Sequence, residues 1–298
     1  EGNIDALKTR LIGTCRSLGL PFEIIFINDG SRDATLEHLI ALSREVPEIR
    51  VLSFARNFGV MAGYRAGIVS ARGDAVVVID GDLQDPPELI PELIAKWKSG
   101  SHVVYGQRRG TGNSGPKKLL SSLYYWLIVK FSGVAVPPHV GTFGLMDRSI
   151  VDRMKGLEER QFFFAVQRAW LGGKQDAVLY DRVEREHGSS RVGLKRQMRF
   201  AWTAVTSISN APLRAVSAFA LCASFVLFLI GATAIGIRLF TDLATPNWAT
   251  ITTLVGFVGF VQSLVLAVIA EYIAVIFEEV KGRPLYYVQE EYRNGDIV

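Results

Sequence analysis

Residues 76–88 read VVVIDGDLQDPPE, and this stretch decides how the rest of the chain is interpreted. It opens as a short, continuous run of mostly β-branched residues, which is typical of a buried parallel strand. Asp80, Asp82 and Gln84 then follow at alternate positions. Because strand side chains point to the same face at every second residue, we expect these three groups to share one face where the strand ends.

These side chains have the chemistry of a divalent-cation site. Ligands of an open α/β sheet bind beyond the carboxyl ends of its strands. Mg²⁺ and Mn²⁺ prefer oxygen ligands, and they commonly combine one or two carboxylates with substrate phosphates. The alternative is a strand end with solvated carboxylates and a capping Asp85. In either case Pro86 and Pro87 end the strand, and Glu88 begins a helix.

Strand-like segments alternate with helical patterns up to residue 192, which predicts an α/β domain with a mostly parallel sheet. The expected strands lie at 22–27, 49–54, 75–80, 102–106, 140–146 and 178–186. The chain itself begins with a helical pattern at Leu7, Leu11 and Leu18. A doubly wound domain normally starts with a strand, so we expect a first strand to precede Glu1.

Two long apolar runs follow this domain. Residues 215–237 and 243–270 contain no charged residue, and each run is long enough to cross a bilayer. Before them, an apolar stripe at helical spacing predicts an amphipathic helix lying on the membrane surface. The expected organisation is a catalytic domain, this amphipathic helix, a pair of spans and a tail, at 1–192, 193–211, 212–278 and 279–298.

Basic residues flank the apolar runs on both outer sides. They are Lys195, Arg196, Arg199, Arg214, Lys281 and Arg283. The positive-inside rule therefore predicts a protein of the inner membrane whose N-terminal domain and C-terminal tail are both cytoplasmic. Gln262 and Glu271 lie within the second run, and such polar groups favour helix association, so we expect a homo-oligomer.

Composition narrows the function further. The net charge of +4 over 298 residues fits a membrane surface or phosphorylated substrates, and we expect no nucleic-acid partner. The two cysteines, Cys15 and Cys222, exclude a disulfide framework or a zinc motif built from cysteines.

Other polar clusters follow the strands. Asp29 and Ser31 lie in a turn after residues 22–27, where a carboxylate can accept from a base or ribose; the alternative is a capping turn. Arg56 is placed to pair with a diphosphate, or is a surface arginine. Residues 110–115 match G-x-G-x-x-G, but no acidic residue lies about twenty positions on, so we do not expect a dinucleotide site.

Two further groups of basic side chains can bind phosphate. Lys117 and Lys118 follow the glycine-rich loop, which is suited to closing over a phosphate. Arg185, Ser190 and Arg191 provide arginine and hydroxyl donors for a second phosphate. The alternative for this second group is a solvated loop near acidic lipid headgroups.

Four segments, INDGSRDAT, ARNFG, IDGDLQDPPE and EVKGRPLY, together resemble the inverting family 2 glycosyltransferases of GT-A fold. Within these, the chain is similar to the polyprenyl-phosphate glycosyltransferases over essentially its whole length. The resemblance implies a Rossmann-like mixed sheet with helices on both faces, followed by an interface helix and two transmembrane helices. It also implies a nucleotide-sugar donor and a polyprenyl phosphate acceptor.

The resemblance also assigns roles to residues. Asp82 and Gln84 would hold Mg²⁺ or Mn²⁺ on the donor diphosphate, with Asp80 beside the donor sugar. Glu1, Asp29, Ser31, Arg56 and Arg108 would contribute to donor binding. Lys117, Lys118, Arg185, Ser190 and Arg191 would hold phosphate, including that of the acceptor.

The sequence departs from the family at two positions. Asn28 stands where relatives often have Asp, and Thr142 replaces a carboxylate that is sometimes proposed as a base. A phosphate monoester has a second pKa near about 6, so it is already ionised at neutral pH and needs no base. We therefore expect transfer of one sugar, from UDP-glucose or UDP-N-acetylglucosamine, to polyprenyl phosphate. The alternatives are a processive polysaccharide synthase and an inactive, membrane-tethered binding module.

Overall fold

The computed structural model describes residues 2–109, 137, 140–157, 159, 163–181, 211–240 and 248–298. Two compact units make up the chain, and each is described by itself. The first contains residues 1–193 and 283–298, and the second contains residues 194–282.

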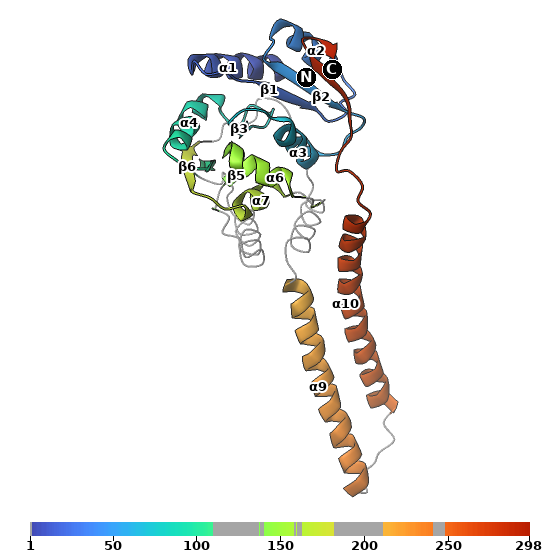
Figure 1. Ribbon diagram of the computed structural model, residues 1–298. Coiled ribbons are helices and arrows are strands. Elements are labelled where there is room, and N and C mark those ends of the chain that lie inside the picture. Colours follow the sequence, from blue (N-terminus) through green and yellow to red (C-terminus); the bar gives the residue numbers. More distant parts are fainter. Residues whose placement is uncertain are drawn as a thin grey trace. The chain divides into compact units, whose positions relative to one another are not determined.

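The first unit holds two four-stranded sheets (Figure 1). One has the order β1-β2-β7-β8, and the other has the order β3-β5-β4-β6. The strands are β1 (Ile24–Asn28), β2 (Ile49–Phe54), β3 (Ala75–Val78), β4 (Val103–Arg108), β5 (Val140–Asp147), β6 (Gln175–Tyr180), β7 (Val288–Arg293) and β8 (Asp296–Ile297). The helices of this unit are α1 (Ile4–Ser17), α2 (Thr35–Glu45), α3 (Val60–Ser70), α4 (Ile90–Lys98), α6 (Arg148–Lys155) and α7 (Phe164–Trp170), with a short 3₁₀ turn η1 (Pro87–Leu89).

Helices cover both faces of the sheets, as expected. Ile49 and Val51 of β2 pack in one cluster with α2, whereas Leu52 and Phe54, on the opposite face, pack with Ala62 of α3. Every residue of β2 is buried because both of its faces are covered. Burying one such aliphatic side chain contributes about 1.5–3 kcal/mol.

The sheets are mixed, but parallel pairs are the minority among the described pairings. β1–β2 and β4–β6 are parallel. The pairs β2–β7, β3–β5, β4–β5 and β7–β8 are antiparallel. Each antiparallel pair involves β5 or β7, so the other three strands of each described sheet run in one direction, which agrees with the expected mixed, mostly parallel sheet.

The C-terminal tail completes the first sheet. β7 pairs with β2 in a register that sets Val51 opposite Tyr292. Asn294 and Gly295 both have positive φ, at 54° and 83°, and this two-residue turn returns the chain into β8. No strand is predicted in this tail from the sequence, although Asn-Gly is a strong hairpin signal.

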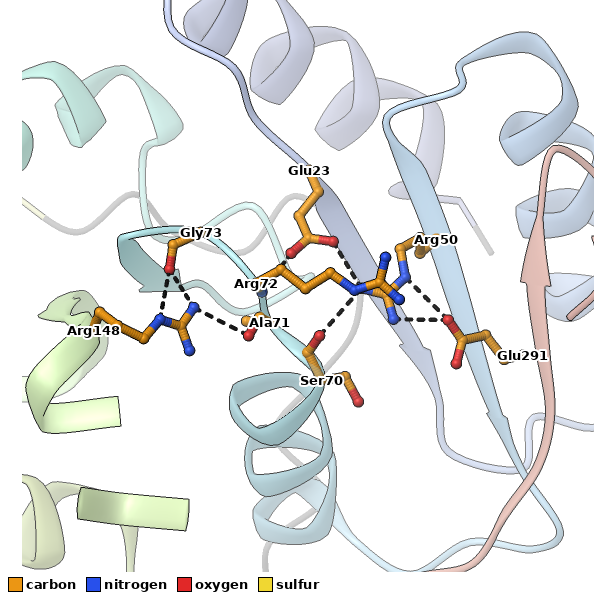
Figure 2. A network of polar contacts seen from close by, with 8 residues as sticks. All are labelled: Glu23, Arg50, Ser70, Ala71, Arg72, Gly73, Arg148 and Glu291. Carbon is orange, nitrogen blue, oxygen red and sulfur yellow. Dashed lines mark hydrogen bonds and ion pairs between the residues drawn. The ribbon is translucent and has the colours of Figure 1, made fainter. Parts of the chain in front are cut away.

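A buried arginine ties the tail to the rest of the sheet (Figure 2). Arg50 is 4% exposed, and its guanidinium lies 2.7 Å from both Glu23 and Glu291. Its Nη1 also donates to the Ser70 carbonyl at 3.2 Å. Burial alone would lower the pKa of Arg50, but the two carboxylates outweigh it and raise that pKa. β7, the residue before β1 and the end of α3 therefore share one cation.

The second unit contains two long apolar helices, α9 (Ala211–Phe240) and α10 (Trp248–Val280), which lie side by side (Figure 1). Their spans Leu213–Ile237 and Leu254–Val280 have mean hydropathies of 2.4 and 2.2, enough to cross a membrane by length and composition. Only 6% and 11% of the most apolar stretches of these two helices are buried within the protein, so the helices are unlike the core helices of a soluble protein. The predicted amphipathic helix at 193–211 lies outside the described residues except for Ala211, which is the first residue of α9.

Candidate active site

The acidic motif lies in a turn beyond the strand. β3 ends at Val78, so the predicted strand through Asp80 is wrong, and strand alternation does not place Asp80, Asp82 and Gln84. Leu83 has φ 62°, a left-handed conformation that costs a leucine about 1–2 kcal/mol. Its buried side chain packs against Leu7 and Leu11 of α1, which holds the turn in this conformation.

Two neutral donors hold the Asp80 carboxylate. Tyr64 of α3 donates its hydroxyl to Oδ1, and Thr142 of β5 donates to Oδ2 at 3.3 Å. Burial, together with the nearby charge of Asp80, raises the pKa of Tyr64 well above its ordinary value, so the phenol keeps its proton. Thr142 therefore serves Asp80 as a hydrogen-bond donor.

Asp82 is half-buried, and its Oδ1 accepts from the backbone N–H of Gln84 at 3.2 Å. Gln84 is 8% exposed. Across the parts of the chain that the structure describes, no group of three or more His, Cys, Asp or Glu side chains could hold a metal ion. This donor set fits a Mg²⁺ or Mn²⁺ ion that takes most of its ligands from a bound diphosphate and water, rather than a structural metal.

Asp29 binds the loop that leads into α3, the helix that carries Tyr64. Its two carboxylate oxygens accept from the backbone N–H groups of Phe58 and Gly59, at 2.6 and 2.9 Å, just before α3. Neither bond caps a helix, because α3 begins at Val60 and its N-cap residue Gly59 has no side-chain cap bond. A carboxylate has about four acceptor positions, so these two bonds leave room for a ligand.

The turn around Asp29 is closely packed. Asn28 is buried, donates to Ser53 Oγ at 3.1 Å and accepts from the Ser31 N–H at 3.2 Å. A Cβ on Gly30, whose φ is 62°, would lie 2.5 Å from the backbone of Arg56. Arg56 itself is exposed, and its guanidinium lies 4.1 Å from the centre of the Phe58 ring. The turn that follows β1 and the loop that contains Arg56 are therefore in direct contact.

Arg108 lies at the end of β4, close to the acidic turn. Its Nε donates to the Tyr180 hydroxyl at 3.4 Å. Burial alone would lower the pKa of Arg108, but Tyr180 and the carboxylates of Asp85 and Asp80 outweigh it and raise that pKa. The negative charge of Asp80 thus acts on the Arg108 guanidinium and favours its charged form.

Arg168 supports the backbone of this site and was missed by the sequence analysis. It is fully buried, and its guanidinium donates to the carbonyls of Gly141 and Thr142 at 2.8 and 3.1 Å. Its Cζ lies 4.4 Å and 4.8 Å from the ring centres of Tyr105 and Phe164. The residue falls in a Gln-Arg-Ala-Trp segment that carries no recognisable motif, so its role depends on tertiary contacts alone.

The remaining predicted residues fall outside the described part of the chain. They are Glu1, Lys117, Lys118, Arg185, Ser190 and Arg191. Their assignments to donor and acceptor phosphates stay predictions.

An acidic turn after β3, backed by a mixed sheet with helices on both faces, is the arrangement expected for a sugar transferase of GT-A fold. Residues 5–155 match the family Glycosyl transferase family 2, and the chain belongs to this family. The predicted family and the enzyme class, glycosyltransferase, are thereby confirmed.

Relatives match the chain over most of its length. An uncharacterized glycosyltransferase of Bacillus subtilis is 39% identical over 272 residues, 91% of this chain and 84% of that protein. The SfII prophage-derived bactoprenol glucosyl transferase of Shigella flexneri is 38% identical over 274 residues, covering 92% and 89% of the two chains. A prophage bactoprenol glucosyl transferase homolog of Escherichia coli is 37% identical over 268 residues, covering 90% and 88%.

Proposed function

We propose that this enzyme transfers one sugar from a nucleotide-sugar to a polyprenyl phosphate at the cytoplasmic face of the membrane. One observation carries the proposal: the match to proteins named bactoprenol glucosyl transferases covers 92% of the chain. A match this long must include most of the two apolar helices as well as the catalytic domain. UDP-glucose is the first donor to test, followed by UDP-N-acetylglucosamine.

The described side chains suit this reaction. Departure of a nucleoside diphosphate develops negative charge, and a preorganised cation such as Arg108 stabilises it. Asp80, fixed by Tyr64 and Thr142, is placed to orient hydroxyl groups of the donor. The acceptor phosphate is already ionised at neutral pH, so a threonine at position 142 is compatible with the chemistry.

Asp82 and Gln84 are the residues that would hold Mg²⁺ or Mn²⁺. When bound, such an ion neutralises charge on the leaving diphosphate. Asp29, which binds the loop before α3, is proposed to face the nucleotide, with Ser31 and Arg56 on the same surface of the domain.

The tail supports the proposed topology. Because β7 pairs with β2, residues 288–293 must lie in the same compartment as the catalytic domain. If α9 and α10 cross the bilayer, they therefore cross out and back, in agreement with the basic residues on their outer flanks. Association of these helices through Gln262 and Glu271 stays a prediction.

The test uses the full-length protein in detergent with radiolabelled UDP-glucose, undecaprenyl phosphate and Mg²⁺. We expect a lipid product carrying one glucose and an equal amount of UDP. Asp82→Ala should lower turnover by at least about a hundredfold, as does loss of a group that stabilises charge in a transition state. Asp5→Ala, which removes an exposed carboxylate on α1, serves as the control.

Three results would each contradict part of the proposal. A polymeric product would identify a processive synthase instead. An Asp82→Ala variant with full activity would remove the metal assignment, and failure of every nucleotide-sugar tried to give a lipid product would remove the acceptor assignment.

A further inference from the structure

The carboxylate of Asp85 has no role in the function described so far, yet it is fully buried. Removing a charged carboxylate from water is costly unless it is paired or hydrogen-bonded. Tyr180, at the end of β6, donates its hydroxyl to Asp85 Oδ1. Burial, followed by the hydrogen bond to Asp85, raises the pKa of Tyr180 to about 12, so the phenol stays protonated at neutral pH.

The same phenol also contacts Arg108. A hydroxyl has one proton to donate, and Tyr180 gives it to Asp85, so its oxygen turns lone pairs toward other donors. Arg108 Nε donates to this oxygen at 3.4 Å, a long hydrogen bond. Asp85, Tyr180 and Arg108 are therefore connected by two successive hydrogen bonds, which join the acidic turn to β6 and β6 to the end of β4.

A second restraint acts on the other side of Arg108. A Cβ on Gly141 of β5 would lie 2.8 Å from Arg108 Nη2 and 3.4 Å from its Cζ. The guanidinium therefore rests in the space left by a missing side chain. Tyr180 fixes its Nε end and Gly141 admits its Nη end, so few side-chain orientations satisfy both contacts.

We propose that Asp85 and Tyr180 are positioning residues that orient the Arg108 guanidinium toward the leaving diphosphate of the donor. This inference rests on the proposed function, because it takes Arg108 as a diphosphate ligand. With Nε turned toward Tyr180, the two Nη groups present the planar pair of donors that grips phosphate oxygens. Orientation matters because a misplacement of about 1 Å can cost on the order of a hundredfold in rate.

The test is a double-mutant cycle on the full-length protein. Wild type, Tyr180→Phe, Arg108→Ala and the double variant are compared for kcat and KM toward UDP-glucose, and for UDP affinity by calorimetry with Mg²⁺. If Tyr180 acts through Arg108, Tyr180→Phe should lower kcat/KM by roughly 5- to 50-fold in the wild-type background. In the Arg108→Ala background it should change kcat/KM by less than about twofold.

Two variants separate positioning from a loss of folding. Gly141→Ala should displace the guanidinium without touching the Asp85–Tyr180 bond, and it should reproduce the defect of Tyr180→Phe. Tyr292→Phe is the matched control, since Tyr292 also donates to a carboxylate, that of Glu290, on β7. It should leave kcat/KM unchanged.

The outcomes are distinct. Equal effects of Tyr180→Phe with and without Arg108 would overturn the inference, as would a Gly141→Ala variant with wild-type kinetics. A wild-type protein that neither turns over UDP-glucose nor binds UDP would overturn the role of Arg108 as a UDP-diphosphate ligand, and this inference with it. Turnover by wild type with an additive cycle would leave the proposed function standing and remove only the positioning role.

Discussion

Replacing Arg50 by methionine tests how strongly the C-terminal strand is tied to the catalytic domain. The substitution removes the bonds to Glu23, Glu291 and the Ser70 carbonyl, and it leaves two carboxylates without their shared cation. The side chains of Glu23 and Glu291 are 23% and 28% exposed, so they are only partly hydrated in compensation. Breaking a buried pair by removing one partner costs about 3–5 kcal/mol.

For a domain of this size, each kcal/mol corresponds to roughly 2–4 °C in Tm, so Arg50→Met should lower the Tm of the catalytic domain by roughly 6–20 °C. The measurement is thermal unfolding of the full-length protein in detergent, followed by near-UV circular dichroism. Limited trypsin digestion should also release the tail earlier than in wild type. Both readouts report on the pairing of β7 with β2.

The control is Lys8→Met, which breaks a surface ion pair of 3.0 Å with Glu45, whose side chain is 63% exposed. Exposed pairs contribute about 0–1 kcal/mol, so this variant should melt within a few degrees of wild type. A Tm for Arg50→Met equal to that of Lys8→Met would refute the reasoning, because the buried network would then contribute no more than a surface pair.

Two further predictions concern single hydrogen bonds. Thr142→Val removes one hydrogen bond to Asp80 and should lower kcat/KM for the nucleotide-sugar by about tenfold, whereas Thr142→Ser should retain the wild-type kcat/KM. Nucleotide release measures both variants, and equal rates for the two would contradict the role of the hydroxyl. Asp147 caps α6, and although burial alone would raise the pKa of its carboxyl, bonds from Ser149 and Trp97 outweigh it and lower that pKa. The Asp147 carboxylate therefore contributes about 1 kcal/mol to the stability of the fold above pH ~4, and this contribution is lost as the pH falls further. The difference in Tm between wild type and Asp147→Asn should disappear in acid. A difference that stays constant with pH would contradict this assignment.

Hydrophobic patterns predicted strands that overlap β1 to β6, because each contains a short apolar run, although the predicted strand at 178–186 shares only residues 178–180 with β6. The turn after β3 was harder to foresee. Leu83 adopts positive φ because its side chain fills a site against α1, and no local signal reports that contact.

The candidate site also combines residues that the sequence indicates with residues that it does not. The acidic residues and Arg108 are recognisable because their chemistry is tied to short motifs. Tyr64, Tyr180 and Arg168 reach the site from α3, β6 and α7, and their partners are set by how those elements pack. Nothing in their immediate sequence separates them from ordinary core residues.

The tail strand also has a consequence for biosynthesis. β2 can acquire β7 only after the ribosome has translated both apolar helices, because α9 and α10 lie between the two strands in the sequence. Until then one edge of β2 presents unpaired backbone groups, which invite pairing with other nascent chains.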